Sequence, residues 1–204
     1  MNMLIKGKKQ LSQLKLNIKM KQRCFWVNDD PLYIDYHDKE WGKPVYDDAT
    51  LFEFLLLESF QAGLSWITIL KKRENFRKAF DNFNYKKIAE YDSTKFDELI
   101  ANAGIIRNKL KVKSAITNAQ LFMEIQKEFG SFSTYIWEYV DGKPIVNTFK
   151  NREEVPATTK ISDAISKALK KRGFKFVGST IIYAFMQATG MVNDHTTDCF
   201  CYKN

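Results

Sequence analysis

Apolar residues recur at helical spacing along most of the chain, and this pattern predicts a mostly α-helical protein. The predicted helices span about residues 47–62, 64–80, 84–90, 93–102, 105–128, 131–139, 162–172 and 178–190. Asp47 or Thr50 is expected to cap the first of them, and Gly190 to end the last. Alternating strand patterns are nearly absent, which argues against a parallel α/β fold.

Two segments fall outside this helical period. Residues 24–46 are predicted to form a loop-rich, aromatic segment, and residues 155–159 a linker.

The chain has 204 residues, 45% of them hydrophobic, so it can bury a sizeable core. This composition excludes a disordered tail or a fibrous repeat.

The positive charge of the chain is concentrated at its N-terminus. Lys and Arg number 32 against 24 acids, a formal net charge of +8. Seven of the basic residues and no acid lie in residues 1–23, which leaves 25 bases against 24 acids in the rest. We therefore divide the chain into a basic extension over 1–23, expected to be flexible, and a nearly neutral helical domain over 24–204. Global charge alone is no evidence for DNA binding.

The chain has neither a membrane span nor the features of a secreted protein. No window approaches the roughly 18 to 20 apolar residues of a span, and Lys15 and Lys19 interrupt the apolar residues of the leader. The three cysteines are an odd number and form no disulfide framework. We expect a cytoplasmic protein without a membrane partner.

Two cysteines and both histidines of the chain form a candidate metal site. Cys24 and His37 lie near one end of the domain, and His195 and Cys199 near the other. Two thiolates and two imidazoles make a closed tetrahedral zinc set, which is typical of structural sites. Such a crosslink would join segments about 160 residues apart and remove much chain entropy. Alternatively, these are ordinary buried or surface residues, or Cys201 takes the place of Cys199.

A carboxylate is predicted on an apolar helix face. At 100° per residue, Glu58 falls between Leu51, Phe54 and Ala62, whereas Glu53 faces another side. A buried carboxylate needs a cation or donors, so Glu58 either caps a helix or pairs with a buried Arg, or it recognises a ligand with an NH₂ group or a positive charge. The second interpretation is favoured by nearby aromatic residues that could sandwich a flat cation: Trp26, Tyr33, Tyr36, Trp41 and Trp66.

A basic, glycine-bearing turn connects the last two predicted helices. Between Ser162 and Lys175 there is one acid, and the basic residues are Lys167, Lys170, Lys171, Arg172 and Lys175. Gly173 and Gly178 flank the turn, so it can present backbone N–H groups to a phosphate. A solvated lysine-rich helix end is the alternative. A second basic patch, Arg107–Lys113, lies in the acid-free stretch 99–123.

Long motifs over residues 20–202 closely resemble one family, DNA-3-methyladenine glycosylase I of the helix-hairpin-helix superfamily. The matching segments are Arg23–Val27, Asp30–Asp38, Glu40–Gly42, Leu57–Glu58, Gln61–Ile67, Leu70–Asn75, Ala103–Arg107, Ser166–Gly178 and Val192–His195. The resemblance implies an all-helical helix-hairpin-helix fold with a structural zinc on Cys24, His37, His195 and Cys199.

The resemblance also implies roles for individual side chains. Glu58 is similar to the family's base-recognising carboxylate, which we take as the catalytic group, and Tyr36 and Trp66 to the residues that stack on the extruded base. Leu64 resembles the wedge that fills the gap in the duplex. The remaining implied residues are Trp26, Tyr33 and Trp41 in the pocket, and Lys170, Lys171, Arg172, Gly173, Lys175 and Gly178 at the DNA backbone. Asp194 lies nearby and as readily caps a turn.

The implied activity is excision of 3-methyladenine from alkylated double-stranded DNA. The methylated base is cationic and leaves as a neutral base, so little acid catalysis is needed. No lysine is placed as a Schiff-base nucleophile, which predicts base release without strand cleavage. We expect a monomer that uses no nucleotide cofactor. The alternatives are a zinc-stabilised nucleic-acid-binding protein without catalysis and an enzyme acting on small nucleosides.

Overall fold

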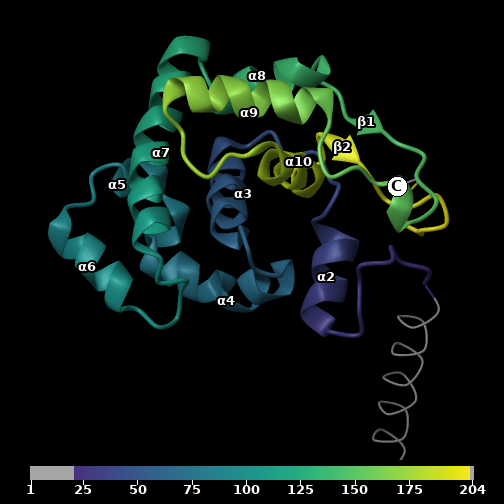
Figure 1. The fold of residues 1–204 in the computed structure, drawn as a ribbon, viewed down its shortest axis with the longest axis horizontal. Coiled ribbons are helices and arrows are strands. Elements are labelled where there is room, and N and C mark those ends of the chain that lie inside the picture. The colour runs from purple at the N-terminus through teal and green to yellow at the C-terminus, as the bar shows by residue number, and fades with distance from the viewer. Residues whose placement is uncertain (1–20, 203–204) are drawn as a thin grey trace, which may run out of the picture.

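The computed structural model describes residues 21–202, and its architecture is built from α-helices (Figure 1). The predicted all-helical class is confirmed. In chain order the helices are α2 (Pro31–Lys39), α3 (Asp48–Gln61), α4 (Trp66–Ala79), α5 (Tyr85–Ile88), α6 (Ser93–Ala101), α7 (Lys109–Phe129), α8 (Phe132–Trp137), α9 (Lys160–Arg172) and α10 (Ser179–Ala188). Short 3₁₀ turns span Asp81–Phe83, Glu138–Val140 and Arg152–Glu154.

Helix α3 lies at the centre of the molecule and contacts α4, α7, α8 and α10 (Figure 1). Its residues from Leu51 to Phe60 are buried, apart from the partly exposed Glu53. A helix that is apolar on nearly all sides belongs in a core. The Asp47 side chain caps it by accepting a hydrogen bond from the Thr50 amide at 2.8 Å. The central helix therefore carries Glu58 into the interior.

Helices α9 and α10 pack against each other and are joined by a short turn over residues 173–178. A capping box between Thr159 and Ser162 begins α9 two residues before the predicted start. Gly173 ends α9 with φ of +103°, a left-handed conformation that favours glycine. The turn and its two helices are thus fixed by local sequence signals.

Helix α2 corrects the sequence analysis, which predicted residues 24–46 to be loop-rich. Asp30 caps this helix by accepting from the Leu32 amide at 3.0 Å, and Pro31 stands in its first turn. Proline is favoured there because its fixed φ suits a helix and its missing N–H is not needed. The aromatic composition hid this start signal. As a consequence, Tyr36 and His37 are buried neighbours on one helix.

The loop after α2 lies against the end of α10. The Gly42 amide donates to the Gln187 carbonyl and the Val45 amide to the Thr189 carbonyl, both at 3.0 Å. A Cβ at Gly190 would lie 2.2 Å from the carbonyl carbon of Lys43, so a side chain would not fit there. This close approach brings the N-terminal and C-terminal segments together.

A minimal sheet completes the contact between distant segments. Strands β1 (Ile145–Val146) and β2 (Val192–Asn193) pair in parallel, with Ile145 opposite Val192. Within residues 21–202 this pair is all the strand structure there is, as the sequence pattern predicts. Strand β2 leads directly into the candidate site.

The predicted N-terminal extension lies outside the described residues up to position 20. From position 21 onward the chain is described, and the Arg23 guanidinium contacts Asp38 at 2.6 Å. Over the described part, no helix combines the length and the apolar character that crossing a membrane requires.

Candidate functional site

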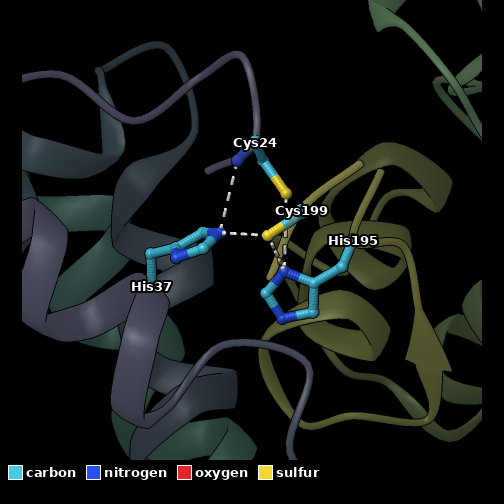
Figure 2. A group of neighbouring side chains, drawn as sticks. All are labelled: Cys24, His37, His195 and Cys199. Atoms are coloured by element: carbon cyan, nitrogen blue, oxygen red, sulfur yellow. Dashed lines mark hydrogen bonds between the residues drawn. The ribbon is translucent and has the colours of Figure 1, made fainter. Parts of the chain in front are cut away.

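Four buried side chains from the two ends of the domain meet in one cluster (Figure 2). His37 comes from α2 and Cys24 from the segment before it, whereas His195 and Cys199 follow β2. The Sγ atom of Cys199 lies 3.4 Å from His37 Nε2 and 3.5 Å from His195 Nδ1. Cys24 Sγ lies 3.4 Å from His195 Nδ1. The fold thus brings together all four predicted metal ligands.

The donor atoms of this cluster fit a tetrahedral ion. All four lie within 4.8 Å of one another. Zinc bonds of roughly 2.0 to 2.3 Å would place tetrahedral donors roughly 3.3 to 3.8 Å apart, close to the observed spacings. Hydrogen bonds, first of all from Cys24, lower the pKa of the Cys199 thiol, and a thiolate is the form that binds a metal.

A second layer of contacts orients the two imidazoles. His37 Nδ1 lies 2.8 Å from a carboxylate oxygen of Asp38, and His195 Nε2 lies 3.2 Å from the Trp41 carbonyl. Such partners fix the nitrogen that faces a metal. Cys201 lies beside the cluster instead, where its amide donates to the Cys199 sulfur at 3.4 Å. Burial raises the pKa of the Cys201 thiol to about 12. Cys199, rather than Cys201, completes the four-residue cluster.

A cavity of about 260 Å³ lies next to this cluster. Trp26 and Trp41 separate the two, with ring centroids 5.2 Å from His37 and 4.7 Å from His195, respectively. All five predicted aromatic residues and Glu58 line the cavity. The complete lining is Phe25, Trp26, Tyr33, Tyr36, Trp41, Glu58, Gln61, Trp66, Val155, Ala184, Gln187 and Asp194.

Glu58 is a buried carboxyl without a partner. It is 3% exposed, and burial raises its pKa to about 8. Among the described residues it has no hydrogen bond or ion pair. The partly buried Arg73 contacts Glu53 at 2.6 Å and Glu40 at 2.7 Å. The first interpretation of Glu58, as a helix cap or the partner of a buried Arg, is therefore wrong. An unpaired carboxyl at a cavity wall is available to a ligand.

The raised pKa predicts that Glu58 makes stability depend on pH. Below the unfolded pKa near 4.5 the group is protonated in both states and adds no pH dependence to the stability. Between about 4.5 and 8 the folded state holds the proton that the unfolded state has lost, so stability falls as pH rises. Relative to Glu58→Gln, the wild type should lose up to about 5 kcal/mol between pH 4 and 9. Urea unfolding of both proteins at these two pH values measures the difference. An unchanged difference would contradict the expectation.

The aromatic rings lie closer together than a sandwich requires. Tyr36 and Trp66 have centroids 5.4 Å apart and planes tilted by 51°. A base held between two rings needs roughly 7 Å, two contacts of about 3.5 Å each. A ligand would therefore stack on an outer face of these rings. The indole N–H groups of Trp26 and Trp66 are buried and, within residues 21–202, have no acceptor.

The sequence analysis assigned no place in the cavity to several lining residues, Asp194 among them. Its buried carboxylate accepts hydrogen bonds from the Tyr183 hydroxyl at 2.6 Å, Asn147 at 2.7 Å and Gln187 at 2.8 Å. Sequence proximity to His195 was the one available signal. Phe25, Gln61, Val155 and Ala184 gave none, because their place in the wall depends on tertiary packing.

The predicted DNA-contacting residues lie on the loop after α3 and at the end of α9. Leu64 is 38% exposed in the loop between α3 and α4. Lys170, Lys171 and Lys175 are exposed, whereas Arg172 makes a two-point ion pair with Glu128 at 2.6 and 2.9 Å.

Hydrogen bonds to other helices hold the glycine-bearing turn. Asn118 of α7 bonds the amide and the carbonyl of Lys175, each at 2.9 Å. Ser166 of α9 donates to the Val177 carbonyl at 2.7 Å. The turn is therefore fixed against both helices.

Solved structures place this arrangement in a class of proteins. A crystal structure of a 3-methyladenine DNA glycosylase I is 51% identical, with a TM-score of 0.86, and the match covers 88% of this chain and 99% of that one. A variant of a 3-methyladenine DNA glycosylase I, in complex with 3-methyladenine, is 36% identical with the same TM-score, over 89% of this chain and 97% of that one. The fold is that of a helical DNA glycosylase.

Sequence comparison defines the family within this class. The family model of methyladenine glycosylase matches residues 26–202. The DNA-3-methyladenine glycosylase of Haemophilus influenzae is 50% identical over 182 residues, which are 89% of this chain and 98% of that protein. The chain belongs to the methyladenine glycosylase family.

Proposed function

We propose that this protein is a base-excision repair enzyme that releases 3-methyladenine from alkylated double-stranded DNA and leaves an abasic site. The observation that carries the proposal is Glu58, an unpaired buried carboxyl in an aromatic cavity. A relative named for this activity shares half of its residues with the chain. A structural neighbour holds 3-methyladenine itself.

Recognition of the base would follow from its charge. In DNA, adenine methylated at N3 is cationic, and a cation beside Glu58 lowers the raised pKa of this carboxyl group. The ionised Glu58 then attracts the base and accepts hydrogen bonds from its NH₂ group. The faces of Tyr36 and Trp66 add cation–π attraction, worth about 0.5 to 2 kcal/mol each in a desolvated site. The unpaired indole N–H groups of Trp26 and Trp66 offer donors to the ring nitrogens. Neutral adenine lacks the charge, so it gains the hydrogen bonds but not the charge attraction or the cation–π attraction in full.

The chemical step requires little acid catalysis. The bond between C1′ and the base nitrogen breaks, and its electron pair leaves with the base, which becomes neutral. Water then adds to the sugar cation and loses a proton, which completes hydrolysis. No enzyme amine forms a bond to C1′ in this scheme, so the strand stays intact. The protein's share is to extrude, bind and orient the nucleotide.

We also propose the helix-hairpin-helix mode of DNA binding for α9, the 173–178 turn and α10. The turn opens into α10 after Gly178, and backbone N–H groups at such a helix start suit a phosphate. Lys170, Lys171 and Lys175 add positive charge around it. Leu64 is the proposed wedge that occupies the space of the extruded base.

The Cys24, His37, His195 and Cys199 cluster is the proposed site of a structural zinc ion. Its support is the burial of all four side chains, their donor spacing and the second layer on both imidazoles. A bound zinc would crosslink the first and last segments of the domain. Four protein ligands leave no open position, so the metal takes no part in hydrolysis.

Release of free base tests the proposed function. Methylated duplex DNA is incubated with the protein, and released bases are separated by chromatography. We expect 3-methyladenine to be released and the DNA strand to remain uncut until alkali is added. Binding to the DNA without base release would favour the non-catalytic nucleic-acid-binding alternative.

Lys175 is expected to contribute one phosphate contact. Replacing it with Ala should reduce the slope of log K against log salt concentration by about 0.9, because one fewer counterion is released. The matched control is Lys127→Ala. Lys127 is an exposed lysine in the last turn of α7, and its loss should leave the slope unchanged. Fluorescence anisotropy of a labelled duplex at four salt concentrations measures both. Equal slopes for the wild type and Lys175→Ala would remove the turn from the interface.

A further inference from the structure

Lys111 is a buried lysine whose ammonium group lies at the C-terminal end of α3. It is 6% exposed, and its Nζ donates to the carbonyl oxygens of Phe60 at 2.8 Å and Ala62 at 2.7 Å. The last carbonyls of a helix lack partners within the helix and carry its negative dipole end. Desolvation lowers the pKa of Lys111. The ammonium group of Lys111 therefore lies where α3 ends and the following loop begins.

Hydrogen bonds hold several backbone groups of the loop that follows. The Leu64 amide donates to the Gln61 carbonyl, and the Gln61 side chain donates to the Leu64 carbonyl, both at 2.7 Å. Gly63 takes a left-handed φ of +82°, which permits the tight turn. Lys111 binds the Ala62 carbonyl. Among the exposed residues of the loop, 63–65, Leu64 carries the large apolar side chain.

Lys111 also connects this loop to the glycine-bearing turn. Its Nζ lies 5.9 Å from the centre of the Phe176 ring in that turn. The Ser59 hydroxyl of α3 lies 3.3 Å from the Phe176 carbonyl. Lys111 stands in the first turn of α7, where its own amide is capped by Asn108 at 3.1 Å. The loop and the turn thus share one rigid support.

We propose that Lys111 is a positioning residue that holds Leu64 in the conformation that enters the duplex. The inference rests on the proposed function and assigns to Lys111 a role through Leu64 rather than contact with DNA. It reinterprets the patch Arg107–Lys113, because Lys111 is turned inward and unavailable to a phosphate. Gln61 belongs to both the loop contact and the pocket lining, so loss of Lys111 should loosen the loop and change the rest of the pocket little.

The test compares two ligands that differ in their need for the loop. Lys111→Met is expected to bind a duplex with a tetrahydrofuran abasic site about tenfold more weakly, as the loss of two charge-assisted bonds suggests. Its affinity for free 3-methyladenine should change less than about twofold. Lys127→Met removes a charge from the same helix and should change neither affinity by more than about twofold. Equal losses for both ligands in Lys111→Met would overturn the proposal.

A double-mutant cycle with Leu64→Ala tests the route of the effect. If Lys111 acts through Leu64, the double variant binds the duplex as weakly as Leu64→Ala alone. Losses that multiply would show an independent role and overturn the proposal. Lys111→Gln, measured in parallel, replaces Lys111→Met in the cycle if the latter does not fold. Base release by the wild type is recorded separately, so failure of the proposed function is distinguished from failure of this inference.

Discussion

Glu58→Gln should release 3-methyladenine from duplex DNA roughly 10² to 10³ times more slowly than the wild type. The expected loss is that of one preorganised, buried electrostatic group. Glutamine keeps the volume and one acceptor but cannot carry the charge that attracts a cationic base. Single-turnover base release measures the rate. Glu58→Ala should in addition abolish or strongly weaken binding of free 3-methyladenine, which calorimetry detects.

The matched control for this experiment is Glu53→Gln on the same helix. Glu53 contacts Arg73 and Arg77, so its loss breaks two ion pairs and leaves these cations with Glu40 and Glu74 alone. We expect Glu53→Gln to be less stable yet to bind free 3-methyladenine normally. Glu58→Gln should show the reverse, a stable fold without base release. Undiminished binding by Glu58→Ala would remove Glu58 from the pocket.

Removal of the metal is the second large expected effect. Chelation of zinc, or the double change His195→Ala and Cys199→Ala, should lower the melting temperature by at least about 10 °C. The reasons are the long chain segment that the crosslink closes and the binding free energy that is lost with the ion. Activity per folded molecule should fall much less. Elemental analysis should find one zinc ion per chain.

The remaining cysteine supplies the control for the metal experiment. Cys201→Ser leaves the four cluster residues in place, so it should keep one zinc per chain and most of the stability. A wild-type protein without stoichiometric zinc would contradict the metal assignment. Loss of zinc from Cys201→Ser equal to that in the double variant would place the ligand at Cys201 instead.

Local signals explain how much of the fold could be predicted. The central helix was found because its sequence is apolar over most of its length and Asp47 marks its start. Helix α2 was missed because its aromatic residues obscured the Asp30–Pro31 start signal. Helix α7 begins at Lys109 rather than 105, since the side chain of Asn108 caps it. Periodicity finds helices, but caps determine where they begin.

The candidate site was predictable where residue type alone defines the chemistry. Two cysteines and the two histidines of the chain suggested a metal cluster before their positions were known. The state of Glu58 was not predictable, because it depends on how deeply tertiary packing buries the carboxyl group and on which cations lie near it. The burial of Asp194 among three donors was equally hidden, since the donors come from separate parts of the chain.

The cavity wall and the metal cluster are interleaved along the same short stretches of backbone. Tyr36 faces the cavity next to His37, and Asp194 lines it next to His195. An insertion or deletion that enlarged the cavity near Tyr36 or Asp194 would therefore also displace His37 or His195 in the cluster. Redesign toward a bulkier base is therefore open mainly at Ala184 of α10, because the side chain of Gln187 on the same helix bonds Asp194 next to His195.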